Sequence, residues 1–223
     1  MDYRSYLTYY KEIGKIDQHV PGLYYPDDEF KKGVILIGDD LVSDTLMMRY
    51  HKLNDAIEIK NKDEVFDIRP TSGASEVHIG KLVFVSEAFE FQGVTRFGFF
   101  ELLTSGRSEL LTKEIYKPDP GIMHDAASSN QKMPIYVPVG SSYLSAVGNT
   151  PAGFKFLPED FERRFYYMAN NASLIEIKKL KKFINTLPNH HEELLQYSKK
   201  KGLQKDREGL VTLFNYYESL TKY

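Results

Sequence analysis

The sequence predicts an α+β protein: an antiparallel β meander, barrel-like or sandwich in form, followed by a small C-terminal helical segment. Apolar residues alternate with polar ones in short runs up to about residue 177, and from residue 178 they recur at the period of a helix. The strand-like runs follow one another at intervals of about 10 to 12 residues without a helix between them. Since a parallel crossover usually needs a helix, this spacing favours antiparallel pairing.

Residues 1–31 are expected to form an N-terminal extension. The run "YRSYLTYYKEI" is compatible with a short helix, whereas "VPGLYYPDDEF" contains Pro and Gly, which break helices. The amino terminus shows no basic segment followed by an apolar stretch, so no secretory signal is visible in the chain as given. A cytoplasmic protein and an exported protein whose signal has been removed would look the same in this respect.

Residues 32–177 are expected to form the β body. The run "KGVILIG" is apolar on both faces, which is typical of a central strand. In "AIEIK", Ile57 and Ile59 lie on one face and charged residues on the other. The link "TSGRS" joins two later strands, and its Gly106 can take a positive φ. The other strand-like runs are "TLMMRY", "EVFDIR", "EVHI", "KLVFVSEAF", "RFGFFELL" and "ELLTKEIY".

Residues 118–161 interrupt the β body with a long irregular loop rich in Pro, Gly, Ser and Asn. Loops of this length are usually functional or disordered. Nothing in the stretch forms a known site, however. The run "GSSYLSAVG" is not a G-x-S-x-G nucleophile elbow, and "MHDAAS" offers too few ligands for a metal site or a catalytic triad.

The body ends in a predicted hairpin. "FYYM" and "SLIEI" both alternate, and Asn170-Asn171 between them is a turn pair because Asn tolerates the left-handed region. Neighbouring strand residues point to opposite faces. Only one of Tyr166 and Tyr167 is therefore expected to face the core.

Residues 178–223 are expected to form helices packed on the body. Leu180, Phe183, Ile184 and Leu187 give the first an apolar face, with most of its lysines opposite. Asn189 is expected to cap the second helix, which Gly202 stops, and Asp206 to cap the third. The apolar stripe of the third helix consists of Leu210, Leu213, Phe214, Tyr217 and Leu220.

Charge is divided unevenly along the chain. Residues 162–223 carry 12 Lys and Arg against 7 Asp and Glu, whereas the residues before them carry 17 against 24. A basic segment of this kind can bind nucleic acid or anionic lipid. The lysines lie in helical contexts and not in a specific nucleic-acid motif, which favours a solvated helix face.

Composition and motifs exclude several classes of site. The absence of cysteine excludes disulfides, thiolate metal sites and cysteine nucleophiles. Phosphate-binding glycine motifs and H-E-x-x-H are absent, and adjacent His190 and His191 do not converge on one metal. No apolar run is long enough to span a membrane. The sequence therefore predicts no catalytic, cofactor-binding or metal residue and no cofactor, and it favours a protein that is not an enzyme.

Three stretches of the chain resemble a family of mostly exported bacterial β-rich proteins with a C-terminal helical tail. They are "EFKKGVILIGDD", "RFGFFELLTSGRSELLTKEIYK" and the region from "RRFYYMANNASLIEI" to "NYYESL", and with the meander between them they cover roughly residues 20–220. Asn170-Asn171 stands where the family usually has an Asp-Gly-like turn. The motifs are structural, and the family has no assigned activity to carry over.

The resemblance implies export to the periplasm or cell envelope. The resulting expectation is a noncatalytic envelope-associated protein that binds a peptide, a glycan or a protein partner. The alternative is a polyanion binder that uses the basic C-terminal helices to bind nucleic acid or a lipid surface.

Overall fold

The computed structural model divides the chain into two compact units. Unit 1 comprises Met1–Phe99 and Glu114–Arg163, and unit 2 comprises Phe100–Lys113 and Arg164–Tyr223. The structure describes residues 7–9, 25–37, 40–41, 44–62, 64–70, 76–91, 93–106, 108–116, 161–169 and 172–221.

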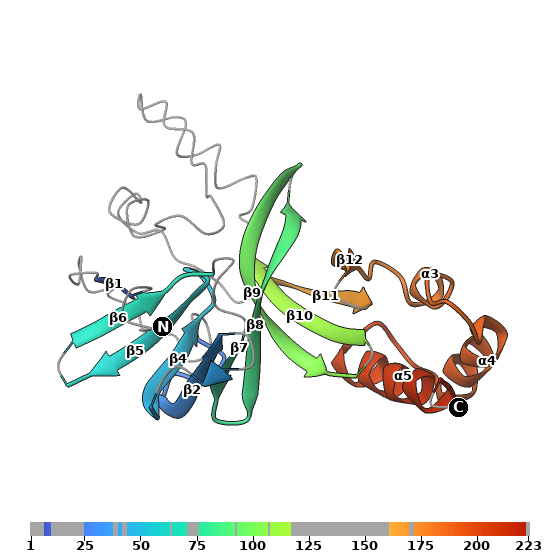
Figure 1. Ribbon diagram of the computed structural model, residues 1–223. Coiled ribbons are helices and arrows are strands. Elements are labelled where there is room, and N and C mark those ends of the chain that lie inside the picture. Colours follow the sequence, from blue (N-terminus) through green and yellow to red (C-terminus); the bar gives the residue numbers. More distant parts are fainter. Residues whose placement is uncertain are drawn as a thin grey trace. The chain divides into compact units, whose positions relative to one another are not determined.

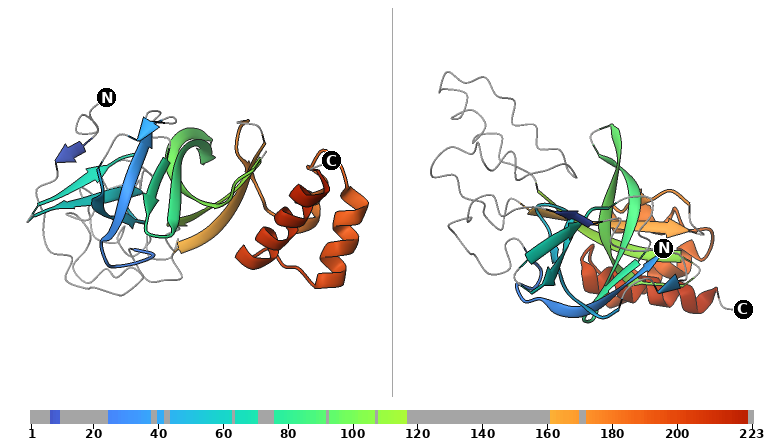
Figure 2. Two further views of the ribbon diagram at one scale, coloured as in Figure 1. Left: turned by 60° about the horizontal axis from the view of Figure 1, so that its bottom comes forward. Right: turned by 60° about the vertical axis from the view of Figure 1, so that its left-hand side comes forward.

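Unit 1 is built from antiparallel strands. Their order is β1-β6-β5-β4-β2-β7-β8 and then the first part of β9, with β3 paired to β2. Figures 1 and 2 show these strands side by side in a twisted sheet. The strands are β1 (Leu7–Tyr9), β2 (Lys31–Ile37), β3 (Asp40–Leu41), β4 (Leu46–His51), β5 (Ala56–Asn61), β6 (Glu64–Ile68), β7 (Glu76–Ile79), β8 (Leu82–Phe91) and β9 (Val94–Thr104).

The predicted antiparallel strands are confirmed, including the central position of β2, which lies between β4 and β7. β6 and β7 follow each other in the sequence but are not neighbours in the sheet, so the strand order departs from a simple meander. One N-terminal expectation is corrected. Within the run expected to suit a helix, Leu7–Tyr9 form β1, which pairs antiparallel with β6. This pairing supplies hydrogen-bond partners to the backbone edge of β6. Helix propensity is a local property and does not take such distant pairing into account. Most of the predicted long loop 118–161 lies outside the described residues.

One face of the sheet forms the core of unit 1. Met48, Ile57 and Ile59 are buried on this face, as the alternation predicted. The Tyr50 ring packs against Phe84, with 4.6 Å between the ring centroids. The full cluster of buried side chains is Ile35, Met48, Tyr50, Ile57, Ile59, Ile68, Val77, Ile79, Phe84 and Phe99.

Gly33 allows β2 and β7 to approach closely above this core. A Cβ atom at residue 33 would lie 2.1 Å from the backbone oxygen of His78 and 2.5 Å from the Met48 side chain. Such a contact is sterically forbidden, so this position requires glycine.

Unit 2 combines the last part of β9 with most of β10 (Ser108–Tyr116), most of β11 (Phe161–Ala169) and β12 (Ile175–Glu176), which adjoin one another in that order. The end of β10 from Glu114 and the start of β11 up to Arg163 belong to unit 1. Three helices follow: α3 (Leu180–Ile184), α4 (His191–Lys201) and α5 (Arg207–Leu220). The α+β class with a small C-terminal helical segment is therefore confirmed. None of the helices in the described part of the chain is both long and apolar enough to cross a membrane.

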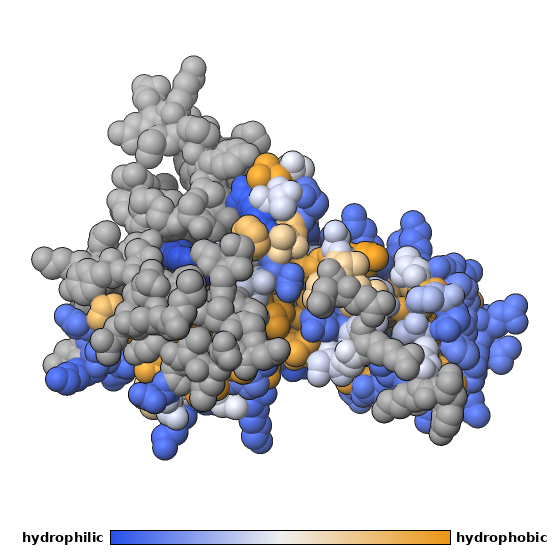
Figure 3. Space-filling view, viewed as in Figure 1, coloured by the Kyte–Doolittle hydropathy of each residue, from blue (hydrophilic) through white to orange (hydrophobic). Residues whose placement is uncertain are grey.

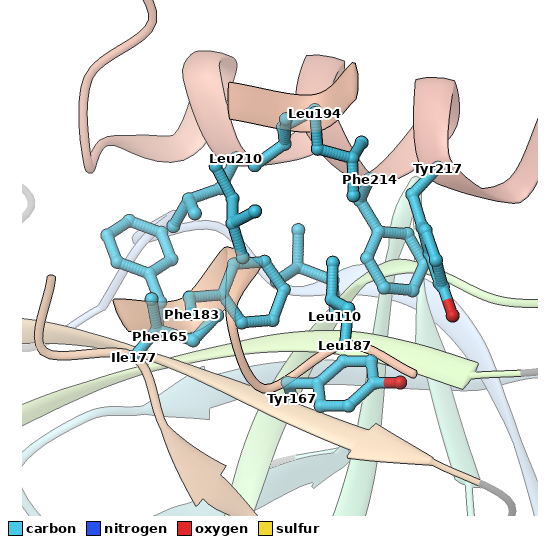
Figure 4. Close-up of a cluster of buried hydrophobic side chains, with 12 residues drawn as sticks. Leu110, Phe165, Tyr167, Ile177, Phe183, Leu187, Leu194, Leu210, Phe214 and Tyr217 are labelled. Carbon is cyan, nitrogen blue, oxygen red and sulfur yellow. The ribbon is translucent and has the colours of Figure 1, made fainter. Parts of the chain in front are cut away.

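The core of unit 2 lies between these helices and strands. Figure 4 shows Leu194, Leu210 and Phe214 from the helices converging on Leu110 and Tyr167 from the strands. The apolar stripes predicted for the helices are thus confirmed. The buried cluster comprises Leu110, Phe165, Tyr167, Ile177, Phe183, Ile184, Leu187, Leu194, Leu210, Leu213, Phe214 and Tyr217.

Two of the three predicted helix ends are confirmed. The Asp206 side chain accepts a hydrogen bond from the Gly209 amide at 2.8 Å, and Gly202 ends α4 with a φ of 64°. The predicted Asn189 cap is wrong. The chain enters α4 through His190, whose φ is 60° and which occupies the cap position without a side-chain hydrogen bond. The left-handed turn at His190 moves the cap one residue further than the sequence pattern indicated.

The predicted β11–β12 hairpin is confirmed, since Tyr166 pairs with Glu176 and Tyr167 with Ile175. The expectation that only one tyrosine faces a core is wrong. Tyr166 and Tyr167 are 4% and 2% exposed because both faces of β11 are covered. The Tyr166 ring contacts Phe100 on one face, and the Tyr167 ring contacts Phe183 on the other.

Gly106 does not adopt the positive φ that the turn "TSGRS" suggested. Its small size matters instead. An added Cβ atom would lie 3.0 Å from Oε2 of Glu218 on α5, closer than most real Cβ contacts.

Candidate functional site

A row of charged residues crosses three neighbouring strands of unit 1 on the face opposite the core. Arg49 on β4 stands beside Glu58 on β5, and Glu58 stands beside Asp67 on β6. Glu58 and Asp67 are 8% and 5% exposed. Burial of charged groups is costly unless they are paired and hydrogen-bonded. The buried charges of this row are therefore expected to have partners, and their contacts are described next.

Arg49 fixes the segment Tyr25–Phe30 to the sheet. Its Nε lies 2.7 Å from Glu58 Oε2, its Nη1 donates to the Asp28 carbonyl oxygen at 3.1 Å, and its Nη2 donates to the Tyr25 hydroxyl at 2.9 Å. The guanidinium also lies over two aromatic rings, 3.8 Å from the centroid of Tyr25 and 4.3 Å from that of Phe30. One side chain thus holds this segment by hydrogen bonds and cation–π contacts.

The Tyr25 hydroxyl completes the arrangement around Glu58. It donates to Glu58 Oε1 at 3.2 Å while it accepts from Arg49. Burial, followed by the charge of Glu58, raises the pKa of Tyr25 well above its usual range, so the hydroxyl keeps its proton and acts as a donor.

Asp67 lies in a less favourable electrostatic environment. Burial first, and then the neighbouring Glu58 carboxylate, raise the pKa of Asp67 to about 6, while Arg69 lowers it. The Arg69 guanidinium lies 3.5 Å from Asp67 Oδ2, and its Nη1 donates to the Asn54 carbonyl oxygen at 3.0 Å. The two carboxylates in adjacent strand positions therefore have different partners: Glu58 pairs with Arg49, and Asp67 with Arg69.

His51 follows Arg49 on the same face and is neutral. Burial, followed by the charge of Arg49, lowers the pKa of His51 to about 3. Its Nδ1 accepts a hydrogen bond from the Asn54 amide at 3.2 Å, which places the ring proton on Nε2. The ring meets Tyr25 edge to face, with centroids 4.7 Å apart.

A pocket of about 510 Å³ opens beside the segment that Arg49 holds. Its apolar lining comes from the core face of the sheet and consists of Tyr50, Ile79, Leu82 and Phe84. Its polar lining comes from Asp27, Glu29, Lys31, Arg49 and Lys81, with Pro26 and Gly80 completing the wall. The volume is within the usual range for small-molecule and side-chain pockets.

Some of the charged residues that line the pocket pair with one another. Lys31 forms an ion pair with Asp27. Lys81 lies in the tight turn between β7 and β8, where Gly80 takes a φ of 59°. Within the described ranges, Lys81 and Glu29 have no ion-pair partner. The rim therefore offers one ammonium and one carboxylate to a ligand that enters over an apolar floor.

The part of the chain that the structure describes contains no group of three or more His, Asp or Glu side chains placed to hold a metal ion. In unit 2, His190 and His191 have separate partners, as predicted for adjacent helix residues. His190 Nδ1 is 3.4 Å from Glu193 Oε2, and His191 Nε2 contacts the Leu187 carbonyl oxygen. In unit 1, Arg49 holds the segment that forms one wall of the pocket.

The sequence did not single out the charged row or the pocket. The available signal was the even spacing of Arg49, Glu58 and Asp67 along a meander of similar hairpins, which brings them into one row. Alternation alone placed Glu58 on a solvated face, since it does not show what covers that face. Comparisons with protein-family models, with curated proteins and with solved structures found no match to this chain.

Proposed function

We propose that the protein is a noncatalytic binding protein whose unit 1 takes an apolar side chain of a peptide or protein partner into the pocket between β8 and the segment Tyr25–Phe30. The observation that carries the proposal is the apolar floor of the pocket behind a rim with charges of both signs. The cell envelope as its location is supported by the sequence resemblance, and fractionation of cells that produce the native reading frame tests it.

One wall of the pocket is already in place before a ligand binds. Arg49 holds the Tyr25–Phe30 segment through its hydrogen bonds and aromatic contacts, so the wall does not have to order when a ligand binds. Preorganisation of this kind increases affinity because less conformational freedom is lost on binding.

The lining favours a peptide side chain over a glycan. Sugar hydroxyls need several hydrogen-bond partners, whereas the strongest polar groups near the floor are engaged within the protein. Arg49 bonds to Glu58, Asp28 and Tyr25, and the Tyr50 hydroxyl donates to Asp55 at 2.8 Å. The apolar part of the lining is formed by Leu82, which is partly exposed, over the buried side chains of Ile79 and Phe84.

The proposal is tested by NMR titration of the ¹⁵N-labelled full chain with three small probes: N-acetyl-phenylalanine amide, N-acetyl-leucine amide and methyl glucoside. At millimolar concentrations we expect the amino-acid amides to shift the amide signals of Gly80, Lys81 and Leu82, because weak fragments still sample a preformed pocket. Methyl glucoside should leave these signals unchanged. Shifts with the glucoside alone, or with none of the probes, would contradict the proposal.

Leu82 and Val83 provide a matched pair of variants. They are neighbours on β8, but Leu82 lines the pocket and Val83 does not. Leu82→Trp fills the pocket and should remove the shifts, whereas Val83→Trp should retain them. Thermal melts of both variants establish that each is folded.

A further inference from the structure

Unit 2 carries a strip of exposed lysines between β12 and α3. Lys178 and Lys179 lie in the extended link after β12, and Lys181 and Lys182 lie on α3. All four are exposed, while Phe183 and Ile184 of the same helix are buried in the core of unit 2. The lysines are thus directed away from the core.

These four lysines have no acidic partners among the described residues. Glu176 is the acidic residue nearest to them in sequence, and its carboxylate faces Arg164 at 3.9 Å. Four exposed lysines therefore lie within residues 178–182, and such a local excess of positive charge is unfavourable unless counterions or an anionic partner are present.

An exposed apolar side chain precedes the lysines in the sequence. Ile175 on β12 is 45% exposed, whereas Ile177, two residues later, is buried. Figure 3 shows hydrophobic and hydrophilic atoms side by side in the region that Figure 1 labels β12 and α3. A cluster of cations with a protruding aliphatic side chain matches a lipid surface, where the charges meet headgroups and the aliphatic group enters the interface.

The lysines of α4 provide a contrast. Lys199, Lys200 and Lys201 occupy the last turn of α4, where the helix dipole favours positive charge, and Gly202 ends the helix after them. Their position has a local explanation. Lys181 and Lys182 likewise lie in the last turn of α3, but the dipole does not account for Lys178 and Lys179, which precede α3.

We propose that the strip formed by Ile175, Lys178, Lys179, Lys181 and Lys182 docks unit 2 on a membrane surface that contains anionic lipid. A nucleic acid fits the strip less well. Proteins that bind nucleic-acid strands without sequence preference present aromatic side chains on which bases stack. The aromatic residue nearest to the strip in sequence is Phe183, and it is only 3% exposed.

Vesicle co-sedimentation of the full chain tests the proposal. The vesicles contain phosphatidylcholine alone or phosphatidylcholine mixed with phosphatidylglycerol. We expect binding to the mixed vesicles that weakens with added salt, and no binding to phosphatidylcholine. Binding that is equal on both vesicles, or absent from the mixed ones, would overturn the proposal. So would tighter binding to a DNA or RNA duplex than to the mixed vesicles.

Two triple variants with the same change in net charge make the test specific. Lys178→Gln with Lys179→Gln and Lys181→Gln should lower the partition coefficient on the order of a hundredfold, since each lysine near an anionic surface is worth about fivefold. The control is Lys199→Gln with Lys200→Gln and Lys201→Gln, which should change binding far less. Equal losses in the two triple variants would mean that net charge alone drives binding, and would overturn the assignment to the strip.

A single variant tests the contribution of the apolar side chain. It also keeps the proposal testable if the first triple variant does not fold. Ile175→Ser removes the exposed aliphatic group without touching the core. It should weaken binding to the mixed vesicles several-fold and leave the salt dependence in place. Unchanged binding would mean that the apolar contact is absent, contrary to the proposed docking.

Discussion

Arg49 Nε and Glu58 Oε2 lie 2.7 Å apart on adjacent antiparallel strands, and both side chains are largely shielded from solvent. Through this pair the sheet holds the wall of the proposed pocket, since the same guanidinium binds Tyr25 and the Asp28 carbonyl oxygen. A substitution here should therefore affect the fold and the pocket together.

The first prediction concerns this pair. Arg49→Met leaves the buried Glu58 carboxylate without its cation, and it should lower the free energy of unfolding by about 3 to 5 kcal/mol. The double variant Arg49→Met with Glu58→Gln should recover part of that loss, because no uncompensated charge remains. Urea denaturation of the two single variants and the double variant gives the coupling energy. Additive losses would show that the two side chains do not interact energetically.

The second prediction concerns the pH dependence of stability at Asp67. Its pKa rises from 3.8 to about 6 on folding, so the folded state holds the proton more tightly. The associated stability is fully present below about pH 3.8 and is lost as the pH rises through about 6. Asp67→Asn should therefore raise the free energy of unfolding at pH 7 by about 2 to 3 kcal/mol, since one pKa unit is worth about 1.4 kcal/mol.

The gain from Asp67→Asn should disappear on acidification. Below about pH 4 the variant and the parent protein carry the same charge at this position and should be equally stable. Taking the difference between variant and parent at each pH removes the opposite contribution of His51, whose pKa falls on folding. A gain that is constant from pH 4 to pH 7 would contradict the raised pKa of Asp67.

The third prediction concerns β11, which is covered on both faces. Tyr166→Ala and Tyr167→Ala should each cost about 3 to 5 kcal/mol, the range found for buried aromatic truncations. Ile175→Ala on the paired strand serves as control, because its side chain is 45% exposed, and it should have little effect. Thermal or urea unfolding of the three variants measures this. A tolerant tyrosine would show that one face of β11 is open in solution.

The fourth prediction separates a real helix cap from an apparent one. Asp206→Ala removes the acceptor for the Gly209 amide and should cost about 1 kcal/mol. Asn189→Ala should fall within about 0.5 kcal/mol of the parent protein, because His190 occupies the cap position of α4. Equal losses at residues 189 and 206 would contradict the entry geometry of α4.

The elements of the fold could be predicted where local periodicity decides them. β2, the strands from β4 to β10 and the three C-terminal helices follow apolar patterns that are complete within each segment, whereas the two-residue strand β3 was not predicted. The Asp206 cap was also predictable, since its partner Gly209 lies three residues away. The extended conformation of Leu7–Tyr9 was not, because it depends on pairing with the distant β6.

The candidate site was not predictable for the same physical reason. Glu58 alternates with Ile57 and Ile59 and so looks like a solvated residue in sequence. Its burial depends on Tyr25, 33 residues earlier, and on the Arg49 side chain that holds it. Likewise, alternation in β11 predicted that Tyr166 and Tyr167 point to opposite faces of the strand. It could not show that Phe100 covers one face and Phe183 the other.

The most direct test of the proposed function uses a peptide selected by display against the full chain, with its affinity measured for the parent protein, Leu82→Trp and Val83→Trp. If the pocket takes an apolar side chain of the partner, Leu82→Trp should weaken binding at least about tenfold, equivalent to about 1.4 kcal/mol, while Val83→Trp stays close to the parent protein. Equal affinities of the two variants would place the peptide elsewhere and would contradict the assignment of this pocket as the binding site.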